Sequence, residues 1–196
     1  MTKDVERFKI VMLGDSSVGK TTLVSFYANA EYVENPTPTI NAGFFGVDVV
    51  VNGTPRVLDI WDTAGQESYN SMVPMYLNKA NGALLVFDVT SRKSFENLLS
   101  WCKFLENGSP DMYVVVFGNK TDLPNREIDP SEAINWASNK GFAFMEGSVY
   151  EGKGVREVFD IVVEGCVSKR NRPASTLIHD VDLSQTEIQS RSSCCF

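Results

Sequence analysis

One stretch near the N-terminus is the most informative about the fold: Phe8-Lys9-Ile10-Val11-Met12-Leu13, followed directly by Gly14-Asp15-Ser16-Ser17-Val18-Gly19-Lys20-Thr21-Thr22. An apolar run that enters a glycine-rich turn and then a helix-like segment predicts a strand, a tight loop and a helix. The spacing G-x-x-x-x-G-K-T is that of a loop that binds phosphate. A loop wrapped at a helix N-terminus supplies converging N–H donors and the positive end of the helix dipole.

This loop is therefore predicted to hold the phosphates of a nucleotide. Lys20 is expected to reach the β- and γ-phosphates, and the hydroxyl of Thr21 to bind Mg²⁺. The alternative is a glycine-rich turn without a ligand, and the rest of the chain has to decide between the two. The predicted phosphate-side residues are Asp15, Ser16, Ser17, Val18, Gly19, Lys20, Thr21 and Thr22.

Composition places the chain among soluble globular proteins of one domain. It has 196 residues, of which 43% are hydrophobic and 22% charged. The net charge of −7 argues against nucleic acid as a partner, since phosphate backbones favour basic surfaces. No secretory signal and no run of about 18 apolar residues is visible. No CxxC spacing occurs, which favours a reducing cytosol over a disulfide framework or a metal site; the cysteines are Cys102, Cys166, Cys194 and Cys195.

Apolar runs alternate along the chain with segments of helical period. This alternation predicts an α/β domain with a mostly parallel sheet. Asn52-Gly53 between the second and third runs is a hairpin signal, so one strand pair is expected to be antiparallel. The predicted strands are 8–13, 47–51, 57–61, 84–89, 113–117 and 142–145, and the predicted helices are 19–28, 94–106, 130–139 and 153–168.

Two gaps in this pattern, residues 29–43 and 63–80, are candidates for mobile loops near the ligand, because open α/β sheets bind ligands at the carboxyl ends of their strands. Beyond the last helix the sequence is rich in Ser, Thr and Gln and has no sustained period. We therefore expect a domain over residues 1–170 and a disordered tail over residues 171–196.

A second phosphate-side motif follows the third predicted strand, at Asp62-Thr63-Ala64-Gly65-Gln66. A carboxylate at a strand end can hold Mg²⁺ through water, which suits Asp62. Gly65 has no side chain, so its N–H can approach a γ-phosphate. Gln66 both donates and accepts hydrogen bonds, so it can orient an attacking water. The alternative for this short string is an ordinary strand-to-loop turn.

The string Asn119-Lys120-Thr121-Asp122 follows the fifth predicted strand. Guanine presents two adjacent donors, N1–H and the 2-amino group, which one carboxylate accepts together, and adenine has no such pair. Asp122 fits that role. Asn119 can bond the base and the phosphate loop, and the stem of Lys120 can cover the purine face. Alone, the string is a solvated strand-end turn; behind the other motifs it favours guanine.

The segments 14–21 and 61–67 together resemble the Ras superfamily of small GTPases. Trp61 before Asp-Thr-Ala-Gly-Gln-Glu resembles the Rab branch, and the string 69–76 is most similar to its early-endosomal subgroup. The resemblance covers about residues 7–168 and the last few residues. It implies the three-layer P-loop GTPase fold, with a six-stranded mostly parallel sheet, one antiparallel edge strand and helices on both faces. It also implies a switch that binds GTP or GDP with Mg²⁺, hydrolyses GTP and regulates vesicle traffic.

The resemblance assigns further site residues. Thr39 would bind Mg²⁺ and the γ-phosphate, and it joins Gln66 and Lys20 as a catalytic residue. Around the base, Tyr32 would cover the guanine, with an exposed loop tyrosine as the competing interpretation, and Val149 would donate its N–H to the base. The remaining residues of that base motif are Ser148, which the family shares, and Tyr150, which stands where the family usually has Lys.

The partner-reading surface is also implied by the resemblance. An aromatic trio used for effector contact corresponds to Phe44, Trp61 and Tyr76, with core packing as the competing interpretation. Departures from the Rab pattern on this surface are Pro36, Asn41 and Ser68. The implied partners are a guanine-nucleotide exchange factor, a GTPase-activating protein, effectors, a prenylation escort and a GDP-dissociation inhibitor, with the protein itself a monomer.

The chain ends in Cys194-Cys195-Phe196, which resembles the Rab double-prenylation signal. A single lipid chain anchors only marginally and two anchor stably. We expect the cytoplasmic face of an intracellular, endosome-like membrane and a cytosolic pool. The alternative function is a nucleotide-locked module that binds GTP or GDP and barely hydrolyses it, motivated by Pro36, Asn41 and Tyr150. A kinase that uses ATP is a more distant alternative, against which Asp122 argues.

Overall fold

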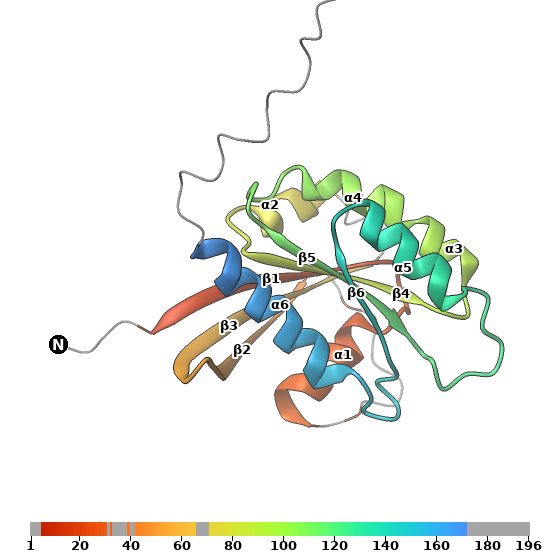
Figure 1. Ribbon diagram of the computed structural model, residues 1–196, viewed down its shortest axis with the longest axis horizontal. Coiled ribbons are helices and arrows are strands. Elements are labelled where there is room, and N and C mark those ends of the chain that lie inside the picture. Colours follow the sequence, from red (N-terminus) through yellow and green to blue (C-terminus); the bar gives the residue numbers. More distant parts are fainter. Residues whose placement is uncertain (1–4, 31, 33–38, 40–41, 66–70, 172–196) are drawn as a thin grey trace, which may run out of the picture.

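The computed structural model describes residues 5–30, 32, 39, 42–65 and 71–171. Strands and helices alternate along the chain, as the sequence predicts (Figure 1). The strands are β1 (Glu6–Leu13), β2 (Ala42–Val51), β3 (Thr54–Thr63), β4 (Gly82–Asp88), β5 (Tyr113–Asn119) and β6 (Ala143–Glu146). The helices are α1 (Lys20–Asn29), α2 (Val73–Leu77), α3 (Arg92–Glu96), α4 (Leu98–Leu105), α5 (Pro130–Asn139) and α6 (Val155–Arg170).

The six strands form one sheet in the order β2-β3-β1-β4-β5-β6. All neighbouring pairs are parallel except β2 with β3, so the predicted mostly parallel sheet with one antiparallel edge strand is confirmed. The hairpin turns at Asn52 and Gly53, whose φ angles of 51° and 71° both lie in the left-handed region. This is the conformation that an Asn-Gly hairpin turn requires.

Helices cover both faces of the sheet, which fixes where the core lies. On one face α1 and α6 pack over alternate residues of the central strands, such as Ile10 and Met12. On the other face α2, α3, α4 and α5 pack over the intervening residues, such as Val11 and Leu13 (Figure 1). Because both of its faces are covered, β4 is buried along its whole length, whereas the edge strand β2 alternates between half-buried and exposed residues.

Three features differ from the sequence-based expectations. The helix predicted over 94–106 begins earlier and is two helices, because Ser91 caps α3 by accepting from the N–H of Ser94 and Asn97 separates α3 from α4. Helix α2 lies inside 63–80, where we predicted only a loop; at five residues it is too short to show a period. Strands β2 and β3 are each ten residues long and extend beyond the predicted runs.

Candidate nucleotide site

The predicted site segments meet at one edge of the sheet. The phosphate loop (14–19) follows β1, and β3, β4 and β5 end nearby at Thr63, Asp88 and Asn119. Because these strands are parallel and adjacent, their carboxyl ends open toward the same side. Segments up to about a hundred residues apart in the chain therefore contribute to one site: the side-chain amide of Asn119 donates to the carbonyl of Val18 over 2.9 Å.

The phosphate loop has the geometry that its glycines predict. Gly14 has φ 139° and lies so close to the carbonyl oxygen of Val86 that a side chain would overlap it. Gly19 has φ 98° and leaves no room for a side chain beside the amide of Asn119. Helix α1 begins directly afterwards, and among the described residues no side chain caps its first N–H groups. Those donors are thus available to an anion.

Lys20, the first residue of α1, is buried against this loop. Its Nζ donates to the carbonyl oxygens of Gly14 and Asp15, each over 2.7 Å. Burial lowers the pKa of Lys20 to about 8, against the opposing effect of the charges of Asp62 and Asp15. The buried ammonium of Lys20 donates to two neutral carbonyl oxygens, so its charge is available to attract a phosphate group.

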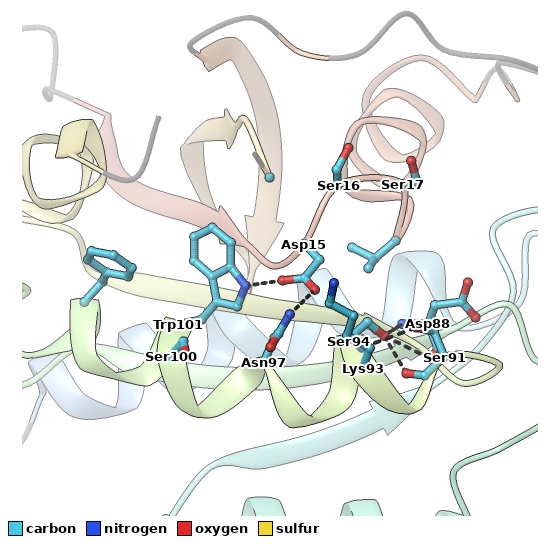
Figure 2. Close-up of a pocket in the computed structure, with 13 residues that line it drawn as sticks. Asp15, Ser16, Ser17, Asp88, Ser91, Lys93, Ser94, Asn97, Ser100 and Trp101 are labelled. Carbon is cyan, nitrogen blue, oxygen red and sulfur yellow. Dashed lines mark hydrogen bonds between the residues drawn. The ribbon is translucent and has the colours of Figure 1, made fainter. Parts of the chain in front are cut away.

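The side chain of Asp15 lies away from the expected phosphate position. Its Oδ1 accepts from the indole N–H of Trp101 over 2.8 Å, and its Oδ2 accepts from the amide of Asn97 over 2.7 Å (Figure 2). Only the backbone of Asp15 is therefore left for the predicted contact. Asn97 and Trp101 were not predicted, and nothing in their sequence neighbourhood points to the loop, which lies more than 80 residues earlier.

The three predicted Mg²⁺ ligands come together. The hydroxyl oxygen of Thr21 lies 2.7 Å from that of Thr39 and 2.7 Å from Oδ2 of Asp62. Thr39 donates to the same carboxylate oxygen over 3.2 Å. Asp62 is only 1% exposed, and burial raises its pKa. Its other oxygen, Oδ1, is buried with no hydrogen-bond partner in the part of the chain that the structure describes.

These observations fit a hard divalent cation. Mg²⁺ prefers oxygen ligands and takes one or two carboxylates together with substrate phosphates. A buried carboxylate with an unsatisfied oxygen is costly unless a cation or a donor meets it. Thr21, Thr39 and Asp62 would hold that cation.

At the other end of the loop, the predicted base-side residues form a connected network. Asn119 accepts from the N–H of Val149 over 3.3 Å, in addition to its bond to Val18. Lys120, in the left-handed region with φ 69°, donates to the carbonyl of Ser17 over 2.9 Å. The hydroxyl of Ser148 donates to Oδ1 of Asp122 over 2.5 Å. The network joins the phosphate loop to both base-side segments.

Lys120 has a partner that the sequence analysis did not assign. Its Nζ pairs with Oδ2 of Asp88 over 2.7 Å. Burial acts to raise the pKa of Asp88, but hydrogen bonds from Lys120 and Thr90 outweigh it, and the pKa is lowered. The ion pair with Asp88 and the hydrogen bond to the carbonyl of Ser17 together fix the direction of the Lys120 side chain.

Comparison with known proteins agrees with this geometry. The sequence profile of the Ras family matches residues 9–168, which is most of the chain. This chain belongs to the Ras family. It is 34% identical to the Ras-related protein Rab-5A of Dictyostelium discoideum over 192 residues, which is 96% of each chain. It is 36% identical to the Ras-related protein RABF2b of Arabidopsis thaliana over 191 residues, 95% of this chain and 94% of the relative. The resemblance to the Rab branch of small GTPases is thereby confirmed.

The departure of this Ras-family chain at Tyr150 has a structural counterpart. The ring of Tyr150 meets the ring of Tyr32 edge to face, with centroids 5.4 Å apart and an interplanar angle of 83°. The two side chains are 69% and 44% exposed. The predicted cover of the base and the residue that replaces the usual Lys are thus in contact with each other.

The predicted effector trio is also contiguous. Trp61 lies between Phe44 and Tyr76, with ring centroids 5.3 Å and 5.5 Å away. Phe44 is more than half exposed, Trp61 is half-buried, and Tyr76, a residue of α2, is buried in the core. Core packing therefore accounts for Tyr76, while Phe44 and Trp61 reach the surface.

Gly65 lies against the phosphate loop, so close to the backbone of Asp15 and Ser16 that no side chain would fit.

Within the described residues, no helix is both long and apolar enough to cross a membrane. Several predicted residues lie outside the described part of the chain: Pro36, Asn41, Gln66, Ser68, Cys194 and Cys195.

Proposed function

We propose that this protein is a GTP-hydrolysing switch of membrane traffic that cycles between GTP- and GDP-bound forms. The observation that carries the proposal is the convergence of Thr21, Thr39 and Asp62 beside the buried Lys20. The same phosphate loop is tied at its other end to the base-side segments through Asn119. One site would thus bind the phosphates, the cation and the base.

The phosphate side works by positioning and charge. The N–H groups at the start of α1 and the ammonium of Lys20 would bind the β- and γ-phosphates. Mg²⁺, held by Thr21, Thr39 and Asp62, would neutralise the charge that develops on the phosphates. Gln66 would orient the attacking water, and Gly65 would offer its N–H to the γ-phosphate.

The base side would select guanine. Ser148 occupies one oxygen of Asp122, which fixes the direction of the carboxylate. A carboxylate held this way accepts the two adjacent donors of guanine, and adenine would leave it unpaired. Val149 would donate its N–H to the guanine carbonyl, and the contacting rings of Tyr32 and Tyr150 would together cover one side of the base.

Switching would follow from contacts made only with GTP. Thr39 contacts Thr21 at the proposed cation site, and Gly65 packs against the phosphate loop. From these positions both would contact a γ-phosphate. Loss of that phosphate removes both contacts, which is how such loops change conformation on hydrolysis. The switch would reside in residues 1–170, and Phe44 and Trp61, with Tyr76 beneath them, would form the surface that effectors read.

Membrane attachment would come from residues 171–196. Prenylation of Cys194 and Cys195 would supply the two chains that stable anchoring needs. The similarity of 69–76 to the early-endosomal subgroup favours the cytoplasmic face of an endosomal membrane. The proposed partners are the exchange factor, the GTPase-activating protein, the prenylation escort and the GDP-dissociation inhibitor.

The test is single-turnover GTP hydrolysis. A Ras-family enzyme hydrolyses GTP unaided at roughly 10⁻⁴ s⁻¹, and an arginine from an activating protein raises the rate roughly 10⁵-fold. We expect slow unaided hydrolysis, strong stimulation by a Rab GTPase-activating protein, and loss of that stimulation in Gln66→Leu. Tight GTP binding without hydrolysis under either condition would instead identify a nucleotide-locked module, and a stimulated Gln66→Leu variant would refute the role of Gln66.

A further inference from the structure

The phosphate loop carries an aspartate whose charge is opposite to what a phosphate site needs. Asp15 places this carboxylate against α4 and the residue that precedes it, where both oxygens accept from neutral donors, Trp101 and Asn97. In Figure 2 the carboxylate lies between these two side chains, while the side chains of Ser16 and Ser17 lie on the other side of the loop. The hydrogen bonds thus hold the negative charge away from the phosphate face.

We propose that Asp15, Asn97 and Trp101 form a positioning cluster that fixes the phosphate loop and sets the rate of nucleotide release. Asn97 and Trp101 would not touch the nucleotide; they would act through Asp15. The inference rests on the proposed binding of guanine nucleotide.

The cluster is built to hold one geometry. Trp101 is buried, with its indole packed in the core between α4 and the sheet, so its N–H has a fixed direction. Asn97 stands at the junction of α3 and α4, where it ends one helix and precedes the other. Hydrogen bonds to a charged acceptor are about twice as strong as those between neutral groups. A pocket of about 590 Å³ lies beside the cluster, and Asp15, Asn97 and Trp101 all line it.

Asp15 also connects the cluster to the phosphate-binding groups. Its carbonyl oxygen accepts from Nζ of Lys20 over 2.7 Å. Its backbone, with that of Ser16, is the surface against which Gly65 packs without room for a side chain. A shift of Asp15 would therefore move the lysine and the glycine that are proposed to contact the β- and γ-phosphates. Since α4 packs against α2, the cluster also links the loop to the helix that follows the motif at residues 62–66.

The experiment measures release of N-methylanthraniloyl-GDP from the full chain after addition of excess GDP and Mg²⁺. Trp101→Phe keeps the aromatic packing and removes the donor, and Asn97→Leu removes the other donor without altering the tryptophan. We expect each to accelerate release about tenfold to 100-fold, the size that one hydrogen bond to a charged group allows. Trp136→Phe, in α5 away from the loop, is the matched control and should release at the wild-type rate.

A second comparison separates positioning from general stability. In an Asp15→Ala background, Trp101→Phe should have no further effect on release, because the acceptor is already gone. Release from Trp101→Phe and Asn97→Leu at the wild-type rate would overturn the cluster and leave the proposed function intact. Equal acceleration by Trp101→Phe with and without Asp15 would also overturn it. A wild-type chain that does not retain the labelled GDP would refute the proposed function itself, and the cluster with it.

Discussion

The contact between Tyr32 and Tyr150 gives a quantitative prediction about nucleotide retention. Edge-to-face rings with centroids 4.5–7 Å apart contribute about 0.5–1.5 kcal/mol beyond their buried area, and this pair lies at 5.4 Å. Because the rings are 44% and 69% exposed, we take the lower part of that range. Loss of the pair should then cost about 0.5–1 kcal/mol, which corresponds to a release of GDP about twofold to fivefold faster.

The perturbation is Tyr150→Ala, and the assay is release of fluorescent GDP by stopped flow at fixed Mg²⁺ concentration. Tyr150→Phe keeps the ring and removes only the hydroxyl, so it should behave as wild type. Tyr32→Ala should accelerate release, and the double variant should release no faster than the faster single variant, because both substitutions remove the same contact.

Two results would refute this reasoning. One is a Tyr150→Ala variant whose release rate equals that of wild type. The other is a double variant in which the two effects simply add, since additivity means that the rings do not act as a pair. Either result would mean that the contact between Tyr150 and Tyr32 does not affect the rate of GDP release.

Two further predictions concern stability. Gly165 lies against the ring of Tyr113 with no room for a Cβ, so Gly165→Ala should lower the free energy of unfolding by about 1–3 kcal/mol in urea titrations at fixed GDP. Glu164→Ala, on the exposed side of the helix, is the control and should change the free energy of unfolding by less than about 0.5 kcal/mol. A Gly165→Ala variant as stable as wild type would contradict the packing. The lowered pKa of Asp88 means that its ionised form stabilises the fold above its unfolded pKa, and that this contribution is lost as pH falls through its folded pKa. The stability gap between wild type and Asp88→Asn should therefore be constant near neutral pH and narrow only as the pH falls below the unfolded pKa of an aspartate, about 3.9. A gap that does not change with pH would show that the Lys120 pair does not act through charge.

Much of the fold follows from local chemistry. Apolar runs of the right length predicted each strand. Asn52-Gly53 predicted the antiparallel strand pair, because a two-residue hairpin turn needs two successive residues in the left-handed region and Asn-Gly is a favoured pair for it. The convergence of Lys20, Asp62 and Asn119 was also predictable, because each follows or ends a strand and parallel strands end on the same side.

The features that the sequence did not reveal depend on contacts between distant segments. The apolar period continues from Phe95 into Leu98, so nothing local separates α3 from α4 at Asn97. Its side chain donates to a carboxylate 82 residues away. The orientation of Asp15 likewise depends on where α4 lies on the sheet, and the pairing of Tyr32 with Tyr150 depends on the arrangement of two loops. Such contacts require the three-dimensional structure.

The most direct test of the account is competition between nucleotides for the fluorescent GDP complex. Asp122 accepts from Ser148, and its proposed role is to accept two adjacent donors that guanine presents and adenine lacks. We therefore expect GTP and GDP to displace the label and ATP to be weaker by roughly 10⁴-fold. Displacement by ATP at concentrations comparable to those of GTP would contradict the account.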